Sequence, residues 1–251
     1  MNSTILLSTS RSGTTFIDKK LNGMCGYEIG GEIFFEKFFI NNQIEHLINC
    51  KTKEYNEKTD VKLRGTDIYS ENCFYTVNKD TIKEMVKETK NVVFNIHLCQ
   101  IKNNLSLMKK IKTPILFLIR KNRWQRQISC YVHRRSLMSG HIVDSNTKSI
   151  NVKIDKSELI NKCEVDFNLL REFQKELKNQ KNIKIIYYED IQNKEYWTDE
   201  FINELEDFMK VKFTTRNYIP PFKKTRNFVN IINEAEIMDE EMIKKYYIKE
   251  I

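Results

Sequence analysis

The stretch Ser8-Thr9-Ser10-Arg11-Ser12-Gly13-Thr14-Thr15-Phe16 decides the fold of this chain. The run Thr4–Leu7 precedes it, and apolar residues follow it at helical spacing, at Ile17 and Leu21. That order predicts a strand, a loop of small residues and a helix. The backbone N–H groups of such a loop, the positive end of the helix dipole and the charge of Arg11 would together hold a phosphate-like anion. A polar turn before an ordinary helix is the alternative interpretation.

The loop departs from the nucleotide-binding pattern G-x-x-x-x-G-K-[ST] at two positions. When Gly13 is aligned with the second glycine, Ser8 stands at the first glycine and Thr14 at the lysine. Without that lysine, a triphosphate site lacks the point charge that contacts the β- and γ-phosphates. The positive charge of this loop comes instead from Arg11.

The composition fits one domain with a single hydrophobic core. The chain has 251 residues, of which 40% are hydrophobic, and this size predicts one α/β domain that spans residues 1–251. The 7 glycines and 3 prolines leave no low-complexity linker that would mark a domain boundary. The formal net charge of +8 favours an anionic ligand, and the charges of residues 51–78 either face an acceptor or form a solvated surface.

The cysteines and the hydropathy of the sequence indicate in which cellular compartment to expect the protein. The 6 cysteines include no C-x-x-C pair, so we expect reduced, mostly buried thiols, not a zinc site or a disulfide framework. The sequence shows no charged-then-apolar leader and no apolar run of membrane-spanning length. We therefore expect a cytoplasmic location without a transmembrane segment, while the oligomeric state stays open.

Two side chains are candidates for a general base. Glu32 follows two glycines at the expected start of a helix, where a carboxylate can be accepted near a ligand, or where it simply interacts with the helix dipole. His97 lies near the C-terminal end of the buried run Val92–Leu98. Ligands collect at such strand ends in open α/β sheets, although a hydrogen-bonded core histidine is the competing interpretation.

A second anion-binding pair follows the clearest strand. The apolar run Pro114–Ile119 predicts a central parallel strand and ends at Arg120, and the helix expected over residues 123–138 carries Ser129. The arginine, by forked charge-assisted bonds, and the serine, by its hydroxyl, can converge on one phosphate. A basic helix that binds nucleic acid is the alternative, but the apolar residues between its arginines indicate an inward-packing face.

The C-terminal half continues the α/β pattern. We expect a helix over residues 156–178, a buried strand over Ile183–Asp190 and a helix over Phe201–Met209. Two prolines then introduce a basic loop that can close over a bound nucleotide. The loop contains Lys223, Lys224, Thr225 and Arg226.

Four separated stretches resemble the sulfotransferases that use 3′-phosphoadenosine-5′-phosphosulfate (PAPS), and they fall in the family's order. S-T-S-R-S-G-T-T-F resembles the 5′-phosphosulfate loop, and L-I-R-K-N-R-W-Q-R-Q-I-S the 3′-phosphate motif. I-I-Y-Y-E-D-I resembles the late Y-E-D-L strand, and P-F-K-K-T-R-N-F-V-N-I-I-N the C-terminal basic loop. The resemblance implies a P-loop-like three-layer fold with a central, mainly parallel sheet flanked by helices. The cofactor-binding positions that it implies are Arg11, Ser12, Gly13, Thr14, Thr15, Phe16, Arg120, Ser129, Tyr188, Lys223, Lys224, Thr225 and Arg226.

The resemblance implies catalytic roles for Arg11 and for a base, and it leaves two bases open. The spacing from Arg11 through Gly30-Gly31-Glu32 is similar to bacterial carbohydrate sulfotransferases, in which a glutamate here is the proposed base. F-N-I-H-L, with His97, resembles the K-T-H-L strand of cytosolic sulfotransferases, whose histidine has that role. Asn95 stands where many relatives have lysine, which leaves Arg11 as the main charge on the sulfuryl group.

The expected reaction is transfer of the sulfuryl group of PAPS to a hydroxyl acceptor, a small molecule or a glycan and preferably a carbohydrate. In-line displacement would release adenosine 3′,5′-bisphosphate, with no metal ion and no nucleic-acid partner. A P-loop-type kinase of small metabolites is the first alternative. A non-catalytic basic module that binds nucleic acid is the second.

Overall fold

The fold is described from a computed structural model of the chain. The described residues are 3–9, 11–26, 28–32, 92–98, 108–109, 111–135, 150–193, 197–220 and 229–249. The chain divides into two compact units. The first unit comprises Met1–Thr9, Gly13–Ile119 and Leu177–Pro220, and the second Ser10–Ser12, Arg120–Glu176 and Pro221–Ile251. The expectation of a single domain over residues 1–251 stays a prediction.

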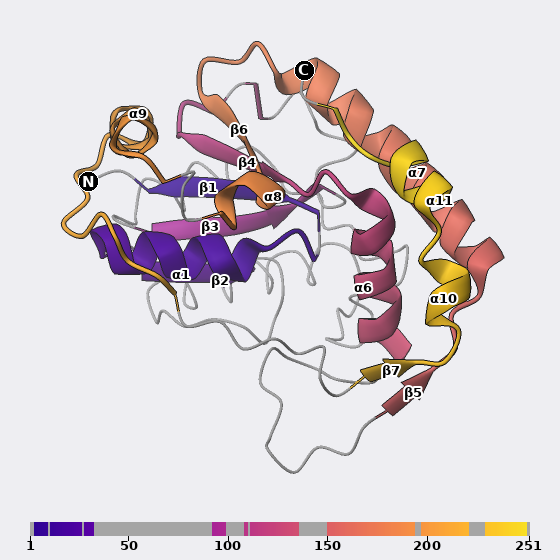
Figure 1. The fold of residues 1–251 in the computed structure, drawn as a ribbon. Helices are drawn as coiled ribbons and strands as arrows, with labels where there is room; N and C mark the ends of the chain where they lie inside the picture. Colours follow the sequence, from indigo (N-terminus) through magenta and orange to yellow (C-terminus); the bar gives the residue numbers. More distant parts are fainter. Residues whose placement is uncertain are drawn as a thin grey trace, which may run out of the picture. The chain divides into compact units, whose positions relative to one another are not determined.

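A parallel sheet forms the centre of the first unit (Figure 1). Its strands lie in the order β2-β3-β1-β4-β6, and each neighbouring pair is parallel. The first strand of the chain therefore lies in the middle, between β3 and β4. The bounds are Thr4–Ser8 for β1, Glu28–Glu32 for β2, Val92–His97 for β3, Ile115–Ile119 for β4 and Ile183–Tyr187 for β6.

The burial of the central strands explains their continuous runs of apolar residues. Every residue of β1 and of β4 is buried. A strand of a parallel sheet that is covered on both faces needs apolar side chains at successive positions, not at alternate ones. The strand runs expected around Thr4 and Ile115 are thus confirmed, and so is the α/β class with a central parallel sheet.

Three described helices of the first unit share one core with the sheet. They are α1 (Thr14–Cys25), α8 (Tyr188–Ile191) and α9 (Asp199–Met209). The core combines apolar side chains of all three helices with one face of the strands. Its members include Leu6, Val93, Leu116 and Ile186 from the sheet and Ile17, Leu21, Met24, Ile191, Ile202, Leu205 and Met209 from the helices.

Glycines of α1 and β2 have other roles than their local sequence suggests. Gly23 does not stop the helix, because α1 continues to Cys25 and ends at Gly26, whose φ is 67°. A Cβ atom on Gly23 would lie 2.2 Å from the Tyr218 ring, so glycine is needed there for close packing. Glu32 is the last residue of β2, to which both preceding glycines also belong, and the helix expected after it lies outside the described residues.

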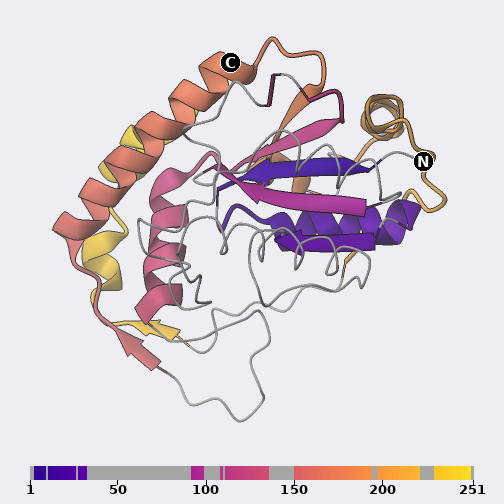
Figure 2. The same cartoon turned by 180° about the vertical axis from the view of Figure 1, so that it is seen from behind.

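The second unit contains helices and a small two-stranded sheet (Figure 2). Strands β5 (Ile150–Val152) and β7 (Val229–Ile231) pair in parallel. The helices are α6 (Arg123–Arg135), α7 (Lys156–Leu177, of which the last residue belongs to the first unit), α10 (Glu234–Ile237) and α11 (Glu240–Lys245). The helix expected after Arg120 is therefore confirmed over Arg123–Arg135, and residues 136–138 lie outside the described residues.

A buried aromatic stack organises the core of the second unit. Trp124 of α6 is fully buried and stacks on Tyr246, with ring centroids 6.0 Å apart. Its Nε1–H donates to the carbonyl of Ile237 at 2.7 Å, which satisfies the indole's polar atom inside the core. The face of α6 that carries Trp124 therefore packs inward, as the apolar residues between the arginines predict.

Burial agrees with the expectation of buried thiols for the cysteines that the structure describes. Cys25, Cys130 and Cys163 are buried, while the other three cysteines lie outside the described residues. No helix within the described ranges is long and apolar enough to cross a membrane.

Candidate functional site

The loop after β1 has the expected strand–loop–helix geometry. Ser8 ends β1, and Gly13, with φ 95°, is the N-cap residue of α1. Arg11 also has a positive φ, 61°, which is uncommon for a residue with a side chain. The carbonyl of Gly13 accepts from the N–H of Phe16 at 3.0 Å. Two left-handed residues within three positions make this a tight turn.

Tyr188 lies directly against the glycine of the loop, within the first unit. A Cβ atom on Gly13 would lie 2.2 Å from two carbons of the Tyr188 ring. Tyr188 is the first residue of α8, which begins where β6 ends. Two positions that the sequence assigned to one nucleotide site, far apart in the chain, are thus in contact.

The other loop positions differ in exposure. Ser12 and Thr14 are buried, and Thr15 is half-buried. Phe16 is half-buried and packs against the core of the first unit. The residues Lys223, Lys224, Thr225 and Arg226, and the whole segment 51–78, lie outside the described residues.

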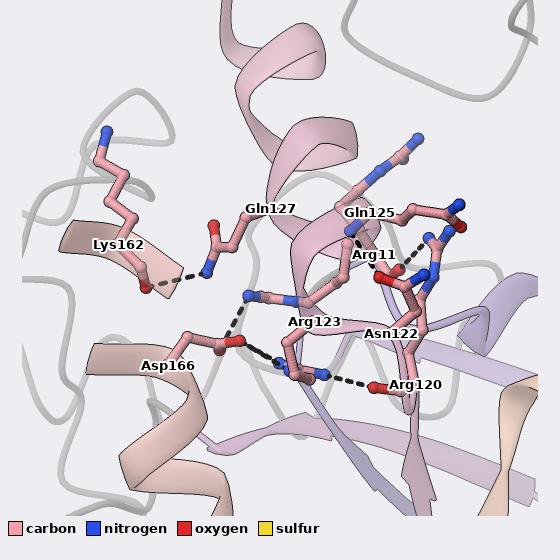
Figure 3. Close-up of polar contacts among 9 residues, drawn as sticks. Arg11, Arg120, Asn122, Arg123, Gln125, Gln127, Lys162 and Asp166 are labelled. Atoms are coloured by element: carbon pink, nitrogen blue, oxygen red, sulfur yellow. Dashed lines mark hydrogen bonds and ion pairs between the residues drawn. The ribbon is translucent and has the colours of Figure 1, made fainter. Parts of the chain in front are cut away.

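Arg11, Arg120 and Ser129 are brought together within the second unit. Arg11 Nε donates to Ser129 Oγ at 3.3 Å. Arg120, which directly follows β4, donates from Nη1 to the carbonyl oxygen of Arg11 at 3.4 Å (Figure 3). Guanidinium and hydroxyl groups are donors that match phosphate oxygens. The three residues therefore form one cluster of donors from two sequence motifs.

A buried ionic cluster lies next to these donors (Figure 3). Arg123 is fully buried and donates from Nε to Asp166 Oδ2 at 2.8 Å. Arg126 Nη1 lies 2.8 Å from Asp166 Oδ1. Sequence reasoning noticed the arginines of this helix but missed Asp166, because the carboxylate comes from α7 and no local pattern links it to α6.

The two guanidinium groups fix the ionisation of Asp166. Burial alone would raise the pKa of Asp166, but the charges of Arg123 and Arg126 outweigh it and hold that pKa below its ordinary value. The carboxylate is therefore ionised at neutral pH. Its contribution to folding is present above the ordinary carboxyl range and is lost as the pH falls through the lowered pKa.

The two candidate bases end neighbouring strands of the first unit. His97 is the last residue of β3, is 3% exposed and pairs in register with Ser8 of β1. Glu32 is the last residue of β2 and pairs in register with Asn95. Carboxyl ends of parallel strands meet at one edge of a sheet, which is where ligands bind in open α/β folds. Both residues are thus placed at the expected edge, and their roles stay predictions.

Asn95 contacts α1. Its Nδ2 donates to Asp18 Oδ2 at 2.6 Å, and both residues are buried. The carboxylate of Asp18 fixes which end of the Asn95 amide faces the helix, because only the NH₂ group can donate. The side chain at position 95 is therefore a neutral amide that a hydrogen bond anchors to α1.

We expect Asp18→Ala to lower the free energy of unfolding by about 1–3 kcal/mol, because the buried amide of Asn95 loses its acceptor. Urea denaturation of the purified protein measures the change. Lys19→Ala, at an exposed position of the same helix, is the control and should change the free energy by less than about 0.5 kcal/mol. Equal effects of the two substitutions would show that the Asp18–Asn95 bond contributes nothing specific.

Among the residues that the structure describes, no group of three or more His, Cys, Asp or Glu is placed to hold a metal ion.

One sulfotransferase domain is among the solved structures to which this chain is similar. No family model matches the chain, and no curated protein matches it. The sulfotransferase domain of the olefin synthase from Synechococcus PCC 7002 is similar in structure, with a TM-score of 0.47 and 12% sequence identity, and the match covers 98% of this chain and 87% of that one.

Proposed function

We propose that this chain is a PAPS-dependent sulfotransferase, which moves the sulfuryl group of PAPS to a hydroxyl acceptor and releases adenosine 3′,5′-bisphosphate. One observation carries the proposal. Arg120 and Ser129, from the stretch that resembles a 3′-phosphate motif, both contact Arg11 of the stretch that resembles a phosphosulfate loop. Two anion-binding motifs in one cluster fit a nucleotide with phosphates at both its 5′ and 3′ positions.

The donors available in the cluster match the chemistry of such a nucleotide. Arg120 offers a planar fork of N–H groups and Ser129 a hydroxyl, which suit the 3′-phosphate. The charge of Arg11 and the backbone N–H groups beside it suit the 5′-phosphosulfate. ATP has no 3′-phosphate, so a kinase would have no use for Arg120 and Ser129 as phosphate ligands.

The proposed reaction is an in-line displacement at sulfur. The acceptor oxygen forms a bond to sulfur as the bond between sulfur and the 5′-phosphate oxygen breaks, and negative charge moves onto that phosphate oxygen. Arg11 and the loop amides stabilise the charge, and Glu32 or His97 takes the proton of the acceptor hydroxyl. In this proposal, cationic side chains do the work that magnesium does in a kinase.

Glu32→Gln should lower turnover by about 10²–10⁴-fold, the range for losing a general base, while nucleotide affinity is retained. His97→Ala should have a milder effect. Initial rates with labelled PAPS, together with the dissociation constant for adenosine 3′,5′-bisphosphate, separate the two quantities. Full activity of Glu32→Gln would transfer the role of the base to His97.

The acceptor class is proposed from the resemblance around Glu32 and from the polar segment 51–78. We propose a carbohydrate hydroxyl in preference to a phenol or a steroid, and a cytoplasmic enzyme. A panel of glycans, phenols and steroids incubated with labelled PAPS tests this directly. Label in glycans supports the proposal, and label confined to phenols or steroids would contradict the acceptor class but not the sulfuryl transfer itself.

A further inference from the structure

The turn between β4 and α6 carries Arg120, and its backbone is held by a side chain that no motif singles out. Arg123 Nη1 donates to the carbonyl oxygen of Arg120 at 3.2 Å. The remaining edge of the Arg123 guanidinium faces the carboxylate of Asp166 (Figure 3). One planar fork therefore joins the turn to α7. Lysine has a single nitrogen at its end and could not make both contacts with the same geometry.

The contacts continue from this carbonyl to the proposed phosphate ligands. Arg120, whose peptide Arg123 orients, reaches with its own side chain to the carbonyl of Arg11. Arg11 in turn donates to Ser129, which lies on the same helix as Arg123. The chain of contacts thus starts and ends on α6. A change in the direction of the Arg120 carbonyl would move all three donors relative to one another.

The C-terminal segment supports the same turn. The N–H of Arg123 donates to the carbonyl of Tyr246 at 3.1 Å, and the N–H of Ile248 donates to the carbonyl of Lys121 at 2.9 Å. Asn122 and Tyr247 form an antiparallel bridge between these bonds. The turn is therefore held from two sides, by backbone bonds from residues 246–248 and by the Arg123 side chain.

We propose that Arg123, fixed by Asp166, is a positioning residue for recognition of the 3′-phosphate. It does not touch the nucleotide but sets the Arg120 peptide, and with it the geometry of Arg11, Arg120 and Ser129. This inference rests on the proposed function, because it assumes that this cluster receives the 3′-phosphate.

The test compares two ligands that differ only in that phosphate, adenosine 3′,5′-bisphosphate and adenosine 5′-monophosphate. The ratio of their dissociation constants is measured by calorimetry in wild type, Arg123→Lys and Asp166→Asn. We expect the preference for adenosine 3′,5′-bisphosphate to be about tenfold smaller in both variants than in wild type. A tenfold change is the lower end of what one charged hydrogen bond contributes. Affinity for the monophosphate should fall by a smaller factor, because it lacks the 3′-phosphate that Arg120 and Ser129 would bind. Asn233→Ala is the matched control, because it removes two hydrogen bonds to the backbone of Ile154 in the same unit without touching the turn.

The outcomes separate this inference from the proposed function. A wild-type ratio near one would refute the proposed function, and the positioning role with it. A clear wild-type preference that both variants retain would overturn the positioning role alone, as would an equal loss of the ratio in Asn233→Ala.

A measurement on wild type decides the matter if the variants do not fold. The amides of Arg123 and Ile248 should exchange hydrogen more slowly with saturating adenosine 3′,5′-bisphosphate than with saturating adenosine 5′-monophosphate. Equal exchange rates with the two ligands would overturn the inference.

Discussion

We expect Gly13→Ala to abolish the proposed nucleotide binding and to lower the free energy of unfolding by about 2–5 kcal/mol, which is the largest effect on stability that we expect from a single added methyl group. Two effects lower the free energy of unfolding at this position, and they add. The backbone has a φ of 95°, which L side chains rarely adopt. The new Cβ would also lie 2.2 Å from the Tyr188 ring, so the loop or the ring must move. Thermal denaturation and calorimetry with adenosine 3′,5′-bisphosphate measure the two effects.

Gly26→Ala separates the two costs. Gly26 also has a positive φ, 67°, but nothing lies within 4 Å of an added Cβ. It should therefore cost only about 1 kcal/mol from the backbone conformation. The double variant Gly13→Ala/Tyr188→Ala should recover part of the stability, because the ring is gone. Equal stabilities of Gly13→Ala and Gly26→Ala would contradict the contact between the loop and Tyr188.

Arg11→Gln should lower sulfuryl transfer by about 10²–10³-fold, the range for removing one group that stabilises developing charge. Arg11 supplies the positive charge of the loop that is proposed to hold the leaving phosphate, because Thr14 stands where a kinase has lysine. The effect should fall mainly on turnover, because the charge that Arg11 stabilises develops only in the transition state. Rates at saturating PAPS and the dissociation constant for adenosine 3′,5′-bisphosphate separate these contributions.

Arg216→Gln is the control for the loss of one positive charge. Arg216 is half-buried and pairs with Asp199 at 2.9 Å and with Glu206 at 3.6 Å, in the first unit and away from the loop sequence. Its substitution should leave turnover within about twofold of wild type, since these ion pairs involve none of the proposed site residues. If Arg11→Gln were as active as this control, the proposed mechanism would lack its central charge.

The central strands were predictable because their sequence signals are local. Burial on both faces requires continuous apolar runs, and the runs around Ile5 and Phe117 are of that kind. The loop at Gly13 was predictable as well, because small residues between a strand and a helix have few other structural explanations. The same local signals placed Arg120 directly after a strand and Ser129 on the following helix.

The features that sequence reasoning missed depend on contacts between distant parts of the chain. A glycine at position 23 suggests the end of a helix, but glycine is needed there because the ring of Tyr218 lies against it. Asp166 looks like an ordinary surface residue of a long helix, yet it pairs with two buried arginines. The short strands β5 and β7 have three residues each, too few to give a periodic pattern. Such features follow from tertiary packing, which no local pattern encodes.

The central claim is that this chain recognises a nucleotide by its 3′-phosphate, and calorimetry tests it most directly. Wild-type protein is titrated in parallel with adenosine 3′,5′-bisphosphate and with ATP in the presence of magnesium, at the same salt concentration. We predict that adenosine 3′,5′-bisphosphate binds at least about tenfold more tightly, because Arg120 and Ser129 gain a charged partner that ATP cannot provide. Tighter binding of ATP with magnesium would contradict the claim and favour a small-metabolite kinase.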